Sequence, residues 1–267
     1  MSGPRATATI LTASVTVTNK SGHKLPSGVG FRRAFVDFRV LDRAGNTLWE
    51  SGRTNSAGLI TDQHGQPIVG ELWWKPDCDG RIAGQPHQPH YEVIERQDQA
   101  QIYQELVTAP PIGVAGQCGP NAAPTGELTT SFLSICGKLK DNRLLPSGFL
   151  SLPQRVEISR ALGAGADMAE DTNPVGVSND PDYRGGGDDT LRYSIPLADL
   201  HGRPASVEAT LYYQATPPFF LQDRFCTAKG TDRDRLAYIA VGLNPVGPPA
   251  GQWKLFLVGS GRVAIGK

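Results

Sequence analysis

The sequence predicts a mostly β protein, namely an antiparallel β-sandwich with long loops and one or two short helices. Its 267 residues include 31 Gly and 21 Pro, and this composition favours many turns and short strands over long helices. Several segments also alternate apolar and polar residues with a period of two, which is the pattern of a strand with one buried face. Strands separated by Gly-, Pro- and Asn-containing turns are typical of a sandwich.

The predicted strands follow from this alternation. In residues 12–18, Ala13, Val15 and Val17 lie on one face and hydroxyl side chains on the other. The sequence Asp-Arg-Ala-Gly-Asn at 42–46 predicts a hairpin turn between two strands. Together these patterns predict strands at 12–18, 34–41, 47–50, 128–135, 207–214 and 253–258.

Helical signals are few. Residues 232–243 carry Leu236, Ile239, Ala240 and Leu243 at helical spacing. Residues 97–107 fit a helix or a strand, and propensity does not decide between them. We expect one elaborated domain over residues 1–267, in which the Gly-, Ala- and Asp-rich residues 160–190 form a long functional loop.

The overall charge excludes some function classes. The 26 basic and 26 acidic residues cancel, whereas nucleic-acid binders usually carry a basic excess. No apolar run approaches the length of a membrane span, and no signal peptide is recognised at the N-terminus. A mature exported chain, a shortened chain and a cytoplasmic protein would all begin in this way.

Four cysteines, Cys78, Cys118, Cys136 and Cys226, lack the close spacing of a zinc site. An even number far apart in sequence is typical of two disulfides in an oxidising compartment, although four reduced, buried thiols remain the alternative. Three pairings are open, and the sequence does not choose among them.

Three histidines are candidate ligands. His23 follows a predicted strand and lies between Gly22 and Pro26, so the backbone holds it rigidly as a metal or haem ligand, or as a structural histidine bonded to its own turn. His87 and His90 are three residues apart, but Pro86 and Pro89 exclude the regular helix on which such a pair shares a metal.

A Gly-rich segment with acidic residues is a candidate calcium site, because hard cations take oxygen ligands from such loops. The alternative is a solvated turn in which aspartates are turn formers. Hydrolase, P-loop and zinc-protease motifs are missing from the sequence. The four calcium candidates are Asp180, Asp182, Asp188 and Asp189.

A set of short motifs gives the chain a family resemblance over residues 10–245. The first is Ser21-Gly22-His23-Lys24-Leu25-Pro26-Ser27-Gly28. The full set, in order, is residues 15–28, 32–36, 49–52, 89–92, 98–105, 128–133, 140–149, 211–214, 217–221 and 224–225. In these motifs the chain resembles the haem-free C-terminal β domain of the bacterial multihaem c-type cytochrome family.

The resemblance implies an exported bacterial protein with a role in respiratory or extracellular electron transfer. The chain has no Cys-x-x-Cys-His, so it binds no haem covalently in the c-type manner, and the implied partner is a multihaem c-type cytochrome or a haem-bearing domain. His23 and His90 are then candidate axial ligands of a partner's haem. Arg32 and Arg33 are candidate partners of haem propionates, or form ordinary salt bridges.

We therefore expect a periplasmic or extracellular, non-catalytic accessory module that docks on a haem protein. Two alternatives belong to other classes. One is a secreted β-sandwich that binds carbohydrate or a cell surface through its tryptophans, and the other is an enzyme with a metal near His87 and His90. The tryptophans are Trp49, Trp73, Trp74 and Trp253.

Overall fold

The computed structural model describes residues 1–113, 118–242 and 256–266. It confirms a mostly β fold with antiparallel sheets and short helices. The chain forms two compact units. Two such units can belong to one domain or to two, so the expectation of one domain over residues 1–267 stays a prediction. Unit 1 comprises residues 1–16, 33–102 and 190–267, and unit 2 comprises residues 17–32 and 103–189.

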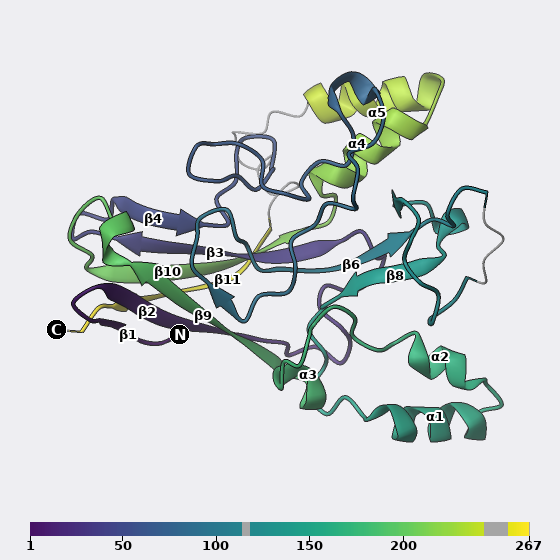
Figure 1. Ribbon diagram of the computed structural model, residues 1–267, viewed down its shortest axis with the longest axis horizontal. Helices are drawn as coiled ribbons and strands as arrows, with labels where there is room; N and C mark the ends of the chain where they lie inside the picture. The colour runs from purple at the N-terminus through teal and green to yellow at the C-terminus, as the bar shows by residue number, and fades with distance from the viewer. Residues whose placement is uncertain (114–117, 243–255, 267) are drawn as a thin grey trace. The chain divides into compact units, whose positions relative to one another are not determined.

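The first sheet of unit 1 is antiparallel and centres on β3 (Arg33–Leu41). On one side β3 pairs with β10 (Ser206–Gln214), and on the other with the short β4 (Thr47–Ser51). Strand β10 also pairs with β11 (Phe256–Ala264). Figure 1 shows β3, β4 and β10 side by side. Almost every residue of β3 is buried, so both faces of this strand are covered.

The second sheet of unit 1 has the order β1-β2-β9-β5. Strands β1 (Ser2–Ala6) and β2 (Ile10–Thr18) are antiparallel, whereas β5 (Val93–Ile94) runs parallel to β9 (Asp188–Pro196). The side chains of β2 and β9 alternate between buried and more exposed, as a half-buried strand requires. The predicted strand at 12–18 therefore lies within β2.

The two sheets of unit 1 pack face to face through aromatic rings. Phe38 of β3 stacks on Tyr193 of β9 with 3.8 Å between ring centroids, and Trp49 of β4 meets both rings edge-on at 6.2 and 6.3 Å. Edge-on contacts such as those of Trp49 are a favoured geometry of aromatic pairs. This cluster is the core of the predicted sandwich.

The other face of β3 is covered by loops. Phe35 packs there in a second buried cluster that loop residues provide, with Tyr212 of β10 against it. Residues two apart in a strand share a face, so Arg33 and Asp37 lie on this loop-covered face with Phe35. The loop residues of the cluster are Ile60, Ile68 and Ala100, and Ile102 lies at the start of a strand.

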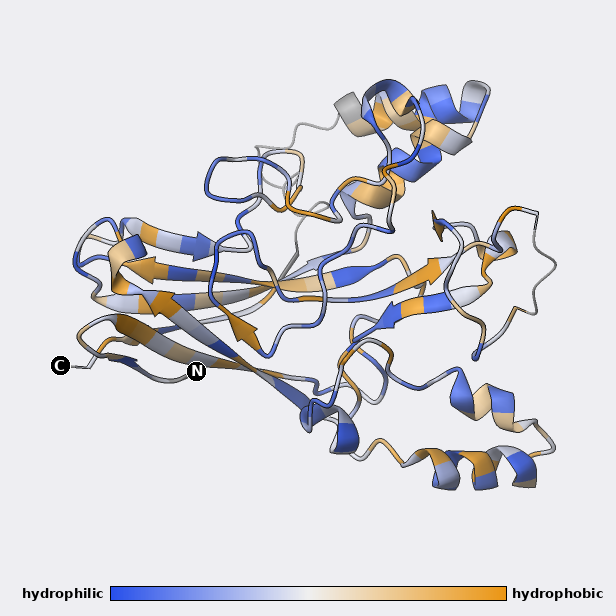
Figure 2. Ribbon diagram, viewed as in Figure 1, coloured by the Kyte–Doolittle hydropathy of each residue, from blue (hydrophilic) through white to orange (hydrophobic). Residues whose placement is uncertain are grey.

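Two helices follow β10 in unit 1. Helix α4 (Pro218–Thr227) is fixed to the loop at 73–81 by the disulfide between Cys78, in the short 3-10 helix η1 (Pro76–Cys78), and Cys226. Helix α5 (Thr231–Gly242) confirms the predicted helix. Apolar and polar residues occur all along α5 (Figure 2). A second 3-10 helix, η3 (Leu197–Asp199), follows β9.

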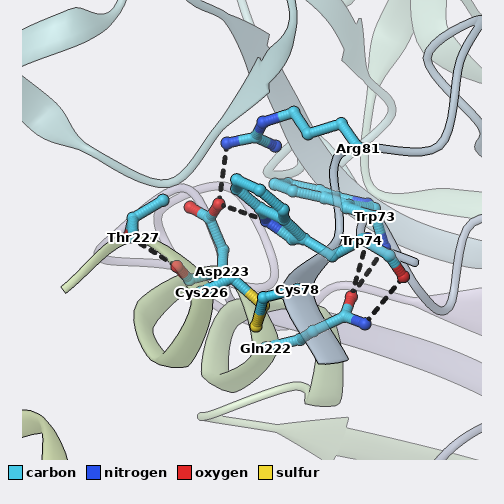
Figure 3. Close-up of a disulfide and its surroundings, with 8 residues drawn as sticks. All are labelled: Trp73, Trp74, Cys78, Arg81, Gln222, Asp223, Cys226 and Thr227. Atoms are coloured by element: carbon cyan, nitrogen blue, oxygen red, sulfur yellow. Dashed lines mark hydrogen bonds and ion pairs between the residues drawn. A yellow bond between two sulfur atoms is a disulfide. The ribbon is translucent and has the colours of Figure 1, made fainter. Parts of the chain in front are cut away.

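Hydrogen bonds near this disulfide attach the loop with Trp73 and Trp74 to α4 (Figure 3). Gln222 Oε1 accepts from the backbone N–H of Trp73 at 2.8 Å and of Trp74 at 3.1 Å. The buried carboxylate of Asp223 accepts from Trp74 Nε1 at 3.1 Å and from Arg81 Nη2 at 2.8 Å. The loop and α4 therefore form one packed substructure.

Unit 2 is built around β6 (Ile102–Thr108), whose first residue belongs to unit 1. Strand β6 pairs antiparallel with β8 (Gly137–Asp141) and with the short β7 (Leu128–Thr129). A second disulfide joins Cys118 and Cys136. The short helices of the unit are α1 (Leu152–Ala161), α2 (Ala166–Glu170), α3 (Asp182–Gly185) and the 3-10 helix η2 (Phe132–Ser134).

Two expectations for single elements need correction. The strand predicted at 128–135 ends at Thr129, because the Thr129 hydroxyl accepts from the backbone of Ser131 and bonds to Ser134, which turns the chain into η2. The loop predicted at 160–190 contains α2 and α3.

The ambiguous residues 97–107 enter a strand at Ile102. Of the strand predicted at 253–258, residues 253–255 lie outside the described residues, and β11 begins at Phe256. None of the helices in the described ranges is both long and apolar enough to cross a membrane.

Candidate functional site

The first motif of the sequence forms a loop in unit 2 that we call the His23 loop, residues 19–28. Asn19 anchors it directly after β2. The Asn19 side chain is buried and donates to the carbonyl oxygens of His23 at 2.8 Å, Leu144 at 3.0 Å and Leu145 at 3.2 Å. Its Oδ1 accepts from the backbone and the hydroxyl of Ser21. One side chain therefore holds both ends of the turn before His23.

Lys24 and Leu25 attach the other side of the loop to the rest of unit 2. Leu25 and Leu144 exchange two backbone hydrogen bonds of 2.9 and 2.8 Å. Lys24 Nζ lies 2.6 Å from Oδ2 of Asp141, the last residue of β8, and the Asp141 side chain is fully buried. His23 thus projects from a loop that is fixed before and after it.

Asp141 is the centre of a charged network beneath the loop. Arg143 contacts it through Nε and Nη2, both at 2.8 Å, and also lies 3.1 Å from Glu105. Burial alone would raise the pKa of Asp141, but the hydrogen bonds from Arg143 and the charge of Lys24 outweigh it, so this pKa lies below its ordinary value. Asp141 is therefore an anion at neutral pH.

The ring of His23 is exposed, and its tautomer is fixed by the loop. His23 Nδ1 lies 3.0 Å from the carbonyl oxygen of Lys24 and 3.3 Å from the hydroxyl of Ser21, whose own proton has acceptors in Asn19 Oδ1 and the His23 carbonyl. A carbonyl oxygen only accepts, so Nδ1 carries the ring proton and the neutral ring keeps its lone pair on Nε2. Metal-binding histidines have this arrangement, in which the second ring nitrogen donates to a carbonyl or a carboxylate.

His90, in unit 1, has the opposite tautomer. Gln101 Oε1 accepts from the backbone N–H of Tyr91 at 2.9 Å, so the Gln101 amide nitrogen faces His90 Nδ1 at 2.7 Å. The Nδ1 atom of His90 therefore accepts, and the neutral ring carries its proton on Nε2. Binding of iron by His90 requires loss of that proton or of the hydrogen bond, so the structure favours His23 over His90.

His87, also in unit 1, donates from Nδ1 to the carbonyl oxygen of Gln85 at 2.9 Å, but its ring is half-buried. No group of three or more clustered His, Cys, Asp and Glu ligands includes His87 in the part of the chain that the structure describes. His87 therefore gains no support as a metal ligand, and the alternative of an enzyme with a metal near His87 and His90 stays a prediction.

The two adjacent arginines have different surroundings, and for Arg33 the structure shows the second of the two expectations, an ordinary salt bridge. Arg33 is buried in unit 1, where Nη1 and Nη2 lie 2.5 and 2.8 Å from the carboxylate of Glu71 and Nε donates to Gln214 at 2.6 Å. These bonds occupy the guanidinium, so Arg33 is not available to a propionate. The cause is its position on the loop-covered face of β3.

Arg32 remains accessible in unit 2. Its side chain is half-buried and folds across Gly28, whose φ of +86° and lack of a Cβ leave room for the guanidinium. Nη1 donates weakly to the carbonyl of Ser27 at 3.4 Å. Arg32 forms no ion pair with any residue that the structure describes.

The four candidate calcium ligands in unit 2 differ in burial and partners. Asp189 is buried and accepts from the Tyr103 hydroxyl at 2.7 Å, while Asp180 is buried and accepts from the backbone of Asp182. Asp188 is exposed and Asp182 half-buried. Within the described part of unit 2 they form no cluster of three ligand atoms, so a calcium site stays a prediction.

The three tryptophans that the structure describes do not form the exposed platform that a carbohydrate site uses. Trp49 lies in the sandwich core, and Trp73 is buried against Phe219 with 4.5 Å between ring centroids. Trp74 is half-buried and covered by Arg81, whose guanidinium carbon lies 4.4 Å from the ring centroid. Trp253 lies outside the described residues. The alternative of a carbohydrate-binding module therefore gains no support.

Comparison with known proteins identifies no family. No family model matches the chain, and no curated protein matches its sequence. Among solved structures, it is similar to a penta-haem cytochrome c552 from Thermochromatium tepidum, with 14% identity and a TM-score of 0.43. The match covers 98% of this chain and 38% of the cytochrome, so the chain spans well under half its length. This degree of similarity carries no functional argument.

Sequence reasoning did not find Asn19, Lys24 or Asp141 as parts of the site. All three lie inside motifs that carry the family resemblance, at residues 15–28 and 140–149. The two motifs are far apart in sequence, and the ion pair between Lys24 and Asp141 joins them.

Proposed function

We propose that this chain is a non-catalytic accessory module that associates with a multihaem c-type cytochrome and offers His23 as an axial ligand to a haem iron of that partner. The observation that carries the proposal is the hydrogen bond from His23 Nδ1 to the carbonyl oxygen of Lys24, which keeps the Nε2 lone pair available on an exposed ring. The family resemblance of the motifs supplies the class of partner.

The chemistry of a haem iron agrees with this geometry. An axial imidazole binds iron through one nitrogen, and a hydrogen bond from the other nitrogen sets the ring orientation and raises the basicity of the ligand. A preorganised ring also loses less conformational entropy on binding. The anchors at Asn19 and Lys24 supply that preorganisation, so His23 is suited to a ligand role in electron transfer.

A location outside the cytoplasm is part of the proposal. The described residues contain two disulfides and no free cysteine. Disulfides persist in oxidising compartments such as the periplasm and the extracellular space. Multihaem cytochromes of the resembled family are exported, so the proposed partner and this chain would meet in the same compartment.

The ligand role is tested with a haem peptide that carries a c-type haem, one histidine ligand and an open axial position. We expect the wild-type protein to convert the haem peptide to the low-spin spectrum, and His23→Ala to abolish this conversion. His201→Ala is the matched control, because His201 is also exposed, and it should behave like the wild type. Conversion that survives His23→Ala but is lost in His90→Ala or His87→Ala would contradict the proposal.

A further inference from the structure

Unit 2 exposes apolar side chains in the short 3-10 helix η2 and directly after it. Phe132 is 60% exposed, Leu133 is 100% exposed and Ile135 is 46% exposed. Single exposed apolar residues are normal on a protein surface, whereas a contiguous group indicates an interaction site. Three such residues within four positions form a group of this kind.

This apolar group reaches the segment that follows the His23 loop. The rings of Phe31 and Phe132 lie 6.3 Å apart, centroid to centroid, at an angle of 43°. Arg32 directly follows Phe31 in the sequence, and its guanidinium lies over Gly28 at the end of the His23 loop. We call Phe31, Arg32, Phe132 and Leu133 the Phe31–Phe132 patch.

The turn that carries the patch is fixed from both sides. Before it, Thr129 bonds to Ser131 and Ser134. After it, Cys136 is joined to Cys118, and the Cys136 backbone N–H donates to Thr108 of β6 at 2.8 Å. A surface fixed in this way loses little conformational entropy when it docks.

The charge of Arg32 indicates what kind of partner fits. Its Nε is buried without an acceptor among the described residues, and it forms no ion pair there, whereas Arg33 and Arg143 are both paired with carboxylates. A guanidinium binds a carboxylate through two parallel hydrogen bonds. The patch therefore combines aromatic and aliphatic surface with an uncompensated cation suited to a carboxylate.

We propose that the Phe31–Phe132 patch docks the propionate-bearing edge of a partner's haem, with the macrocycle against the apolar side chains and a propionate on Arg32. A haem edge is a flat apolar ring with carboxylates on one side, which is the combination that the patch complements. This inference rests on the proposed function, because that supplies a haem-bearing partner, and it adds the docking surface and the residues that recognise the haem.

The test uses metal-free protoporphyrin, which carries both propionates but has no iron and so cannot be bound by His23. Porphyrin fluorescence is titrated with the folded protein. We expect Leu133→Ser and Arg32→Gln each to weaken binding by roughly tenfold, since each removes one part of the contact. Leu162→Ser is the matched control, because Leu162 is an exposed apolar residue of the same unit, at 80%, outside the patch; it should bind like the wild type.

The dimethyl ester of protoporphyrin separates the two contributions. We expect the ester to bind wild type and Arg32→Gln equally, because it offers no carboxylate, while Leu133→Ser still weakens its binding. Arg32→Lys, which keeps the charge but loses the bidentate geometry, should bind the free acid with intermediate affinity. Circular dichroism verifies that each variant is folded.

Three results would overturn the inference. The first is that Leu133→Ser and Arg32→Gln bind protoporphyrin as tightly as the wild type, and the second is that Leu162→Ser weakens binding equally. The third is a protein dimer in ultracentrifugation that Leu133→Ser dissociates, because a second copy of the chain would then occupy the patch. His23→Ala should bind metal-free protoporphyrin like the wild type. Failure of the patch is thus distinguishable from failure of the ligand role, which the iron-containing haem peptide reports.

Discussion

Lys24 and Asp141 form an ion pair across 117 residues of sequence, with 2.6 Å between Nζ and Oδ2. The carboxylate is fully buried and the ammonium nearly so. The pair joins the His23 loop to the end of β8 in unit 2. It therefore couples the presentation of His23 to the stability of the sheet that carries Asp141.

Lys24→Met should lower the free energy of unfolding by about 1–3 kcal/mol, because it removes a charge-assisted hydrogen bond from a buried carboxylate that Arg143 still compensates. It should also weaken binding of the haem peptide although His23 is intact. Urea unfolding and haem titration measure the two effects. Lys20→Met is the control, since Lys20 is exposed in the same loop, and an equal loss in both variants would show that the pair has no positioning role.

Glu71→Ala should destabilise the protein by about 3–5 kcal/mol, because it leaves the buried guanidinium of Arg33 without its counter-ion. It also removes the acceptor of the Ile60 backbone N–H, which lies 2.8 Å from Glu71 Oε2. Denaturant unfolding measures the loss. Asp98→Ala breaks the exposed pair with Arg96 and should change stability by less than about 1 kcal/mol; similar values for both variants would refute the expectation.

Burial raises the pKa of Asp37 to about 6, against the opposing hydrogen bond and charge of Arg39. Between its ordinary pKa of 3.8 and about 6 the native carboxyl holds a proton that the unfolded chain has lost. The contribution of Asp37 to the free energy of unfolding is therefore fully present below pH 3.8. It is lost as pH rises through about 6, and the loss is at most about 3 kcal/mol.

Asp37→Asn should consequently gain stability relative to the wild type as pH rises from about 4 to about 7. Urea unfolding at several pH values measures this difference. Asp98→Asn provides the exposed control and should show no such trend. A relative loss of stability for Asp37→Asn over the same range would show that the native pKa of Asp37 is lowered instead.

The two disulfides should contribute unequally to stability. Cys78 and Cys226 are 148 residues apart, and Cys118 and Cys136 are 18 apart. A cross-link that closes a longer loop removes more entropy from the unfolded chain. Replacing Cys78 and Cys226 by serine should therefore cost about 1–2 kcal/mol more than the same change at Cys118 and Cys136. Thermal unfolding measures which pair of substitutions costs more stability. A larger loss at Cys118 and Cys136 would show that native contacts outweigh loop entropy.

Much of the fold was predictable because it depends on local patterns. The alternation in residues 12–18 and 207–214 places apolar side chains on one face of a strand, and β2 and β10 form there. The apolar spacing at 232–243 likewise predicts α5. Local patterns failed at 128–135, where hydroxyl groups compete with strand hydrogen bonds and turn the chain into η2.

By itself, the sequence determined the β class, the main strands and His23 as a rigidly held candidate ligand. Only the tertiary structure decided the cysteine pairing, the burial of Arg33 next to the half-buried Arg32, and the ring tautomers of His23 and His90. The physical reason is that these depend on partners distant in sequence or on the geometry of a single hydrogen bond. Glu71 and Gln214, 38 and 181 residues away, bury Arg33, and no pattern within one segment reports them.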